Sequence, residues 1–438
     1  AGRVPGPQHR HFTAAADGSR LNAETFGAVA GAELHHAAGL SVVGIPSVPG
    51  VPLDAALRER LDVQAVQRGQ RAPRNADVAV YHIGNNPEIH GWIVDALRAR
   101  PGVVVLHDFV LHHLVAGLTL ARKDVSGYLR AMERDAGLVG RLLGLGVVDG
   151  CVPPLWSTRP EDFPLAGEVL DLAREHALIV HSEHVRKRAV AAGFDGPIRR
   201  IPMPVWPAPQ ASPAAVDGEP VIGSFGFLNA NKRIPQLLEA FAILRLRHPR
   251  ARLLLVGPEA PGLHLEERVE RLGLGDAVER HGYVDEQRFW SLLAACDVCI
   301  SLRWPTMGET SAGVIRMLSL AKPIVVSDVD AFAEFPDDVA VKIAPDEREV
   351  DALVASLLQL VEDPGLAERL SAAARAFAER EHDLARVADL YTATLEEAAG
   401  GAAVRDGLLR EVGEAAADVG VGDTREVSEA LREVGLGR

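Results

Sequence analysis

The chain has 438 residues, enough for two domains of ordinary size that each bury a core. Its formal net charge of −14 argues against a nucleic-acid partner and against strong binding to anionic membranes. No apolar run reaches spanning length, and the first residues lack the apolar middle of a signal peptide, so we expect a cytoplasmic protein. Only five of its 46 basic residues are lysines, a bias typical of GC-rich coding sequence that indicates a bacterial source.

Apolar, β-branched runs alternate with helical periodicity along most of the chain, which indicates parallel sheets covered by helices on both faces. In the first half this pattern predicts strands at Leu40–Ile45, Val78–Ile83, Val103–Leu106, Leu178–His181 and Arg199–Pro202. In the second half it predicts strands at Val221–Phe225, Arg252–Val256, Val278–Gly282, Val298–Leu302, Ile324–Ser327 and Val339–Ile343.

A stretch rich in Pro and Ala separates the two sets of strands and predicts an interdomain linker. We therefore predict an α/β protein with two doubly wound, Rossmann-like domains that face each other across a cleft. The expected boundaries are 1–206 for the first domain, 207–219 for the linker and 220–382 for the second domain. Residues 400–438 form an acidic tail that is either loosely helical or disordered.

Three segments fit this plan less well. The first glycine loop, with Gly27 and Gly31, follows a strand that is barely visible in the sequence. About thirty residues after His112 are helical and amphipathic, and either shape an acceptor pocket or pack on their own domain. Cys296 and Cys299 form one C-x-x-C pair without a second pair, so buried packing is a better interpretation than a metal site.

The most informative stretch is Ser301–Asp328, which has the pattern of a strand, an irregular loop, a helix and a strand. In it Glu309 precedes four residues that open the helix and are mostly small: Thr310, Ser311, Ala312 and Gly313. Small residues leave the amides of a first helical turn open to an anion. A carboxylate beside a phosphate site is favourable only if it accepts hydrogen bonds from hydroxyl groups. Phosphate on the amides and sugar on the carboxylate are what a nucleotide-sugar donor requires.

This stretch resembles the donor-binding motif of retaining glycosyltransferases of family 4, which have the GT-B fold. That motif has two glutamates separated by seven residues, followed by Gly-Lys-Pro. Counted back from Lys322, Glu309 stands one residue after the first glutamate's place, and Arg316 occupies the second. The second acid usually holds the ribose, but a guanidinium can only donate hydrogen bonds, so Arg316 makes that contact differently or not at all. The resemblance also implies that a helix over 383–399 crosses back onto the first domain.

The resemblance extends to the loop after Val221–Phe225. There the family commonly carries an Arg directly after Gly226 and a Lys five residues further on, and both neutralise the diphosphate. Lys232 matches the second position, whereas Phe227 replaces the first, so that Arg233 or Arg303 is expected to supply the missing charge. Gly282 and Tyr283 resemble the family loop that contacts the nucleotide base, although the ring of Tyr283 fits a core position equally well.

In the first domain, His107 ends an apolar strand where the family often has a His that reaches the donor sugar. Asp108 either orients this imidazole or caps the following helix, and His112 and His113 point two ways from that helix. The acceptor side of the cleft is expected to include Gly27, Asn85, Asp108 and His112. The histidine spacing matches no common zinc pattern, so no metal and no cofactor is expected besides the donor substrate.

These features together imply a retaining transfer of a hexose from a UDP-, GDP- or dTDP-sugar, with His107, Lys232 and Glu309 as catalytic residues. The acceptor would be a small molecule, a glycan or a glycolipid. Two alternatives stay open: a GT-B sugar-nucleotide epimerase, and a catalytically silent partner protein. Phe227 and Arg316, which replace two charged family residues, favour the silent partner.

Overall fold

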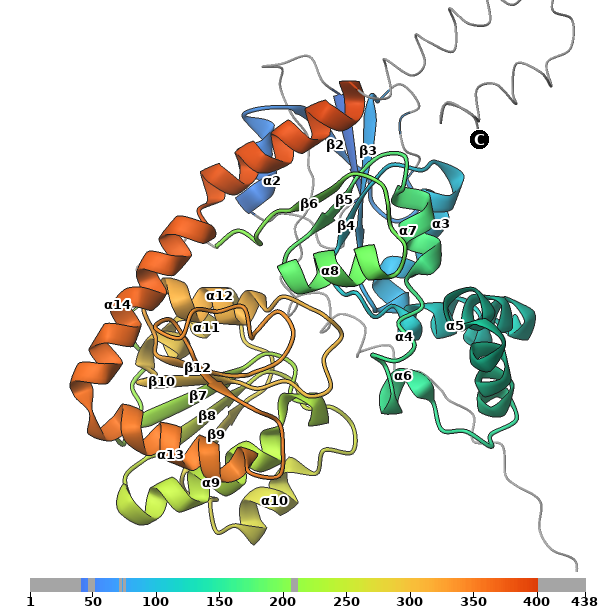
Figure 1. Cartoon of the computed structure of the whole chain (residues 1–438). Coiled ribbons are helices and arrows are strands. Elements are labelled where there is room, and N and C mark those ends of the chain that lie inside the picture. Colours follow the sequence, from blue (N-terminus) through green and yellow to red (C-terminus); the bar gives the residue numbers. More distant parts are fainter. Residues whose placement is uncertain (1–40, 46–51, 71–72, 74–75, 206–211, 401–438) are drawn as a thin grey trace, which may run out of the picture.

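In the computed structural model, which describes residues 41–45, 52–70, 73, 76–205 and 212–400, two six-stranded sheets form the centres of two domains (Figure 1). Every strand pair in both sheets is parallel. Helices cover both faces of each sheet, as the nearly continuous burial of the strands requires.

The first sheet has the strand order β2-β1-β3-β4-β5-β6. Its strands are β1 (Ser41–Ile45), β2 (Asp62–Ala65), β3 (Val78–Ile83), β4 (Val103–Leu106), β5 (Leu178–Val180) and β6 (Ile198–Arg200). Residues 103–106 are buried throughout because apolar cores lie on both faces of the sheet.

The helices of the first domain are α2 (Pro52–Arg58), α3 (Pro87–Ala99), α4 (His112–Leu118), η1 (Leu120–Arg122), α5 (Val125–Val148), α6 (Leu155–Thr158), α7 (Gly167–Ala173) and α8 (Glu183–Ala191). Asn86 caps α3, since its side chain accepts from the amides of Glu88 and Ile89, and Pro87 takes the first helical position. A kink at Ala136 and Gly137 divides α5 into two arms that extend away from the sheet (Figure 1). Gly137 has φ +60°, a conformation that glycine adopts without strain.

The second sheet has the order β12-β11-β10-β7-β8-β9. This is the doubly wound arrangement, in which strands are added first on one side of the first strand and then on its other side. Its strands are β7 (Val221–Phe225), β8 (Arg252–Val256), β9 (Val278–His281), β10 (Val298–Ser301), β11 (Ile324–Ser327) and β12 (Val341–Ile343). Its helices are η2 (Ala230–Lys232), α9 (Ile234–Arg247), α10 (Leu265–Arg271), α11 (Glu286–Ala295), α12 (Ala312–Ser319), α13 (Glu349–Glu362) and α14 (Pro364–Glu381). The topological switch point lies between β7 and β10, where ligands bind in folds of this type.

The chain crosses between the domains twice. The segment that follows β6 leads towards the second domain, and after α14 the helical residues 384–400 pack on the first domain (Figure 1). Their apolar side chains Val387, Ala388, Tyr391 and Leu395 belong to the core on one face of the first sheet. The two crossings are joined by hydrogen bonds, because His382 Nδ1 lies 2.7 Å from the Met203 carbonyl and the Val205 amide donates to the His382 carbonyl at 2.7 Å.

The predicted α/β architecture is confirmed, and each predicted strand corresponds to an observed strand to within about two residues at its ends. One strand, β2, was not predicted, because its four residues (DVQA) alternate too briefly to stand out. The region after His112 is helical, as predicted, but it divides into α4, η1 and α5. The expected glycine loop at Gly27, part of the linker and the tail beyond residue 400 lie outside the described residues. In the described part of the chain, no helix is long and apolar enough to cross a membrane.

Candidate donor site

The site is built at the switch point, where β7 and β10 end side by side. Gly226 follows β7 with φ +95°, and a Cβ atom placed on it would lie 2.6 Å from Nζ of Lys232. Any other residue would therefore push the Lys232 ammonium out of its place. The glycine at this position leaves room for the lysine six residues further along the chain, in addition to allowing the turn.

Two buried cations meet at this point. Lys232 is 7% exposed and its ammonium donates to the Phe225 carbonyl, while Arg303, just after β10, is 6% exposed. Burial and the nearby Arg303 guanidinium hold the pKa of Lys232 well below its usual range, although Glu309 opposes the shift. Among the described residues no carboxylate pairs with Lys232 within 4 Å. A buried pair of like charges is unfavourable unless an anion joins it.

Glu309 is the carboxylate of the site and is held from two sides. Its Oε1 accepts from Nε of Arg303 at 2.9 Å, and its Oε2 accepts from the Met307 amide at 2.7 Å. The side chain is 12% exposed. Glu309 thus pairs directly with Arg303, and the Lys232 ammonium has no paired carboxylate among the described residues.

The first turn of α12 lies directly after Glu309 in the chain. Ser311 caps this helix, since its Oγ accepts from the Val314 amide at 3.3 Å. Within the described residues, no hydrogen bond from the amides of Ala312 and Gly313 is present. A Cβ on Gly313 would meet nothing closer than Ser311 Oγ at 3.6 Å, so there is space beside this residue. Ala312, in contrast, packs with Met203 and Ile315.

The first domain faces this site with Asp108. Its Oδ2 accepts from the Asn85 amide at 2.7 Å, which joins the loops after β3 and β4. Burial and the charge of Glu309 raise the pKa of Asp108 to about 7, although the Asn85 hydrogen bond and Arg303 oppose the shift. Two carboxylates, one from each domain, therefore lie close enough across the domain boundary to influence each other's charge.

Direct contacts hold the domains at this boundary. The Val110 amide donates to the Met307 carbonyl at 2.9 Å, and Gly308 packs so closely on Phe109 that a Cβ on it would lie 2.9 Å from that residue's Cβ. Gly308 occupies the place where the motif has its first glutamate, and this close approach explains why a larger residue does not fit there.

A second contact joins the domains at the start of α8. The carboxylate of Glu334 accepts from the amides of Glu183, at 3.0 Å, and His184. The second domain thus places a negative charge on the N-terminal end of a helix of the first domain, where the helix dipole favours it.

The predicted roles of two arginines are wrong. Arg233 does not supply the missing phosphate charge, because it forms an ion pair with Glu349, with Nε 2.8 Å from Oε2, and Glu349 is 1% exposed. Arg316 does not lie at the donor site, because its guanidinium packs over the rings of Phe289 and Trp290, 5.1 and 5.7 Å from their centroids. Of the two candidates for the missing charge, only Arg303 has its guanidinium close enough to the Lys232 ammonium to lower the pKa of that group.

His112, predicted to lie in the cleft, is a core residue. It is fully buried, with Nδ1 2.8 Å from the Phe163 carbonyl and Nε2 2.9 Å from the Tyr128 hydroxyl. Asn85 has a structural contact as well, because its Oδ1 accepts from the Leu114 amide at 3.1 Å. His107 does lie at the end of β4, but both of its ring nitrogens face other histidines, His82 and His181.

The remaining predicted donor residues lie in segments that follow strands of the second sheet. Tyr283 is 48% exposed after β9, which contradicts a core role for its ring, and Gly282 beside it has open space around it. Phe227 is partly exposed directly after Gly226, and Thr310 is partly exposed before the α12 cap.

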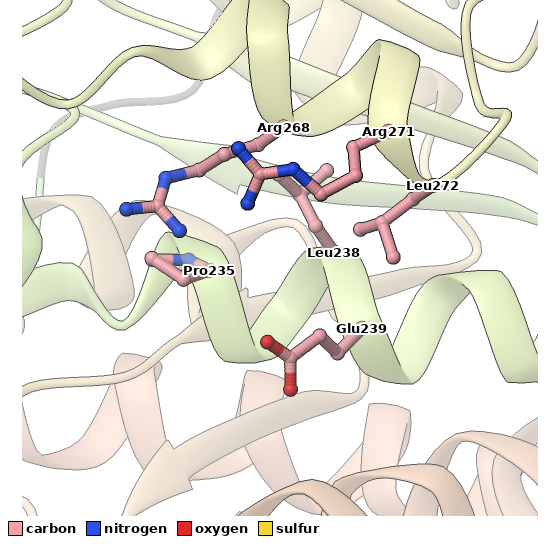
Figure 2. Close-up of a pocket in the computed structure, with 6 residues that line it drawn as sticks. All are labelled: Pro235, Leu238, Glu239, Arg268, Arg271 and Leu272. Carbon is pink, nitrogen blue, oxygen red and sulfur yellow. The ribbon is translucent and has the colours of Figure 1, made fainter.

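A groove elsewhere on the second domain is a different feature. It has a volume of about 70 Å³ and lies between α9 and α10, on the side of this domain away from the first one (Figure 1, Figure 2). Its lining residues are Pro235, Leu238, Glu239, Arg268, Arg271 and Leu272, none of which belongs to the donor site.

Sequence reasoning missed His82 and His181, which contact His107. A signal was present in the sequence, because each of three buried strands has a histidine at or next to its C-terminal end, in VAVYHI, VVVLH and LIVH. Gly308 was missed as well, because its contact with Phe109 depends on how the domains approach each other.

Comparisons with known proteins indicate the class to which this fold belongs. Residues 209–377 match the model of the family described as glycosyl transferases group 1. Among solved structures, Anabaena HepE, crystallised with UDP and glucose, is 16% identical with a TM-score of 0.55, over 82% of this chain and 100% of HepE. Sucrose-phosphate synthase from Thermosynechococcus elongatus is 17% identical with a TM-score of 0.55, over 82% of this chain and 98% of that protein. No curated protein matches this chain.

The similarity to these structures shows the class of the molecule, which has the GT-B fold of two facing Rossmann-like domains. More particularly, the stretch of the second domain that matches the glycosyl transferases group 1 model includes Lys232, Arg303 and Glu309. The matched domain and the GT-B fold together support a glycosyltransferase.

Proposed function

We propose that this glycosyltransferase transfers a hexose from a nucleoside-diphosphate sugar to an acceptor hydroxyl, with retention of the anomeric configuration. The observation that carries the proposal is the pair of buried cations, Lys232 and Arg303, of which only Arg303 forms an ion pair, with Glu309. A diphosphate supplies the anion that this pair lacks, and it would lie at the switch point where such folds bind ligands.

Each group has a distinct task in this proposal. Lys232 and Arg303 offset the negative charge that gathers on the departing nucleoside diphosphate, which lowers the barrier to its departure. The amides of Ala312 and Gly313 donate to phosphate oxygens at the start of α12. As Arg303 turns to the diphosphate, Glu309 becomes available to accept hydrogen bonds from sugar hydroxyls. Asp108 faces the sugar from the first domain.

The proton of the acceptor hydroxyl needs a destination in this reaction. The described site places no side chain as a dedicated nucleophile, and the departing phosphate oxygen is a suitable base. Contact of the domains at Gly308 and Phe109 would exclude the water that otherwise hydrolyses the donor. We further propose a cytoplasmic location, where nucleotide sugars are available.

A UDP-sugar is the proposed donor. HepE is similar to this chain over its whole length and was crystallised with UDP-glucose. The acceptor class is a small molecule, a glycan or a glycolipid.

The test is incubation of the purified protein with UDP-, GDP- and dTDP-sugars, with release of the nucleoside diphosphate followed by mass spectrometry. Glu309→Gln keeps the shape of the side chain and removes its charge, and we expect it to abolish transfer while leaving the fold intact. Near-normal turnover of this variant would remove Glu309 from the site.

A catalytically silent partner is the second candidate, and the position of Arg316 favours it. With that side chain packed on α11, the ribose lacks the acid that the motif usually provides. A silent protein would bind UDP and release no product with any donor, whereas an epimerase would change the sugar of its donor without an acceptor.

A further inference from the structure

Three histidines stand in a row at the C-terminal ends of β3, β4 and β5. His82 Nδ1 lies 3.0 Å from His107 Nε2, and His107 Nδ1 lies 3.3 Å from His181 Nε2. Neighbouring rings are 5.3 and 5.2 Å apart between centroids. The parallel register of the three strands puts all three side chains on the same face of the sheet. We call this row the histidine file.

The file begins at the hinge between the domains. His181 Nδ1 lies 2.8 Å from the carbonyl of Ile201, the residue that follows β6 where the chain leaves the first domain. Two residues further on, the Met203 carbonyl lies 2.7 Å from Nδ1 of His382, which belongs to the second crossing. The carbonyl that anchors the file therefore belongs to the segment that connects the domains.

This anchor fixes the protons of all three rings. A carbonyl can only accept, so His181 must carry its proton on Nδ1, and in a neutral ring its Nε2 is then an acceptor. His107 must in turn donate from Nδ1, which leaves its Nε2 to accept from Nδ1 of His82. All three rings are neutral because burial lowers the pKa of His82 to about 3 and that of His181 to about 4, and lowers the pKa of His107 as well.

We infer that His181 and His82 are positioning residues, which hold His107 in one tautomer and keep it neutral next to Asp108, the residue that faces the donor site. This inference rests on the proposed function. The anomeric carbon gains positive charge as the nucleoside diphosphate departs, and an imidazolium at the end of β4 would oppose that charge. The file also fixes the backbone at His107, and the next residue is Asp108, which faces Glu309.

The variants His181→Gln and His181→Leu separate this role from simple packing. A Gln side chain can donate to the Ile201 carbonyl and accept from His107, whereas Leu can do neither. Ring ¹⁵N NMR of the protein without substrate reports which nitrogen of His107 carries the proton. We expect Nδ1–H in the wild type and in His181→Gln, and a mixture of tautomers in His181→Leu.

The same variants are then compared as enzymes. We expect His181→Leu to lower kcat about 10-fold or more, by misplacing groups at the site, with unchanged affinity for UDP. His181→Gln should restore most of kcat. Nε2–H on His107 in the wild type, or unchanged tautomer and kcat in His181→Leu, would overturn the inference. If the wild type transfers no sugar, the proposed function fails, and the NMR comparison still decides whether His181 sets the tautomer of His107.

Discussion

The substitution Lys232→Met tests the central physical argument, because it should stabilise the protein and weaken its ligand binding together. Met is similar in length and carries no charge. Taking an ammonium out of water costs several kcal/mol, and one carbonyl hydrogen bond, from Phe225, returns only about 1 kcal/mol. Arg303 nearby adds repulsion. We therefore expect a net gain of about 2 kcal/mol in the free energy of unfolding, which corresponds to about 4–8 °C in Tm for a domain of this size.

Binding should change in the opposite direction. A charge-assisted hydrogen bond to a phosphate contributes about 1.5–3 kcal/mol, so the variant should bind UDP roughly 10- to 150-fold more weakly. Thermal unfolding with and without UDP, together with calorimetric titration, measures both effects on the same samples. In the wild type UDP should raise Tm, and in the variant this rise should nearly disappear.

A matched control is Lys322→Met in the same domain. The Lys322 ammonium donates to the carbonyls of Ala294 and Cys296 at 2.8 and 2.6 Å, so its loss leaves two carbonyls without their partner. This control should lower Tm and leave UDP binding unchanged. If Lys232→Met lowered Tm and bound UDP like the wild type, Lys232 would be an ordinary structural lysine and the argument from unbalanced charge would be wrong.

Three further predictions concern the geometry and the titration of the site. Gly226→Ala places a methyl group 2.6 Å from the Lys232 ammonium at a positive φ, and should cost about 1–3 kcal/mol of stability and weaken UDP binding, as urea unfolding and titration would show. The pKa of Asp108, about 7, lies above the unfolded value, so its carboxylate destabilises the fold increasingly from about pH 4 to pH 7. Asp108→Asn should therefore raise the free energy of unfolding at pH 8 by up to about 4 kcal/mol, with no gain at pH 4, as urea unfolding would show. The histidine file has pKa values below the unfolded value of about 6.5, so its stabilisation is present above that pH and is lost as the pH falls towards 4. At pH 5 we expect the free energy of unfolding to fall by about 2 kcal/mol for each of His82 and His181. His181→Gln should reduce this pH dependence. An unchanged urea midpoint between pH 7 and pH 5 would contradict the buried, neutral state.

The sequence predicts the sheet well because strand burial is a local pattern. Runs such as Val103–Leu106 and Ile324–Ser327 are apolar at every position, which a parallel sheet covered on both faces requires. The same reasoning places Lys232 and Glu309 in the segments that follow β7 and β10, since the chain order fixes which loops meet at the switch point.

Long polar side chains were harder to place, because their partners lie far away in the chain. Arg233 is held by Glu349, 116 residues later, and nothing near either residue signals the pair. His112 is bound by Tyr128 across a helix boundary, and Arg316 packs on α11 instead of reaching the cleft. In each case the residue type allowed the predicted role, and the packing of another element decided against it.

The helical residues 384–400 have a consequence for how this protein is made. They complete the core of the first domain with Tyr391 and Leu395, yet the ribosome adds them only after the whole second domain. During synthesis, part of one face of the first sheet therefore stays uncovered, and a chain that stalls before residue 384 exposes that apolar surface to aggregation. Maturation of the first domain is thus tied to the synthesis of residues 384–400.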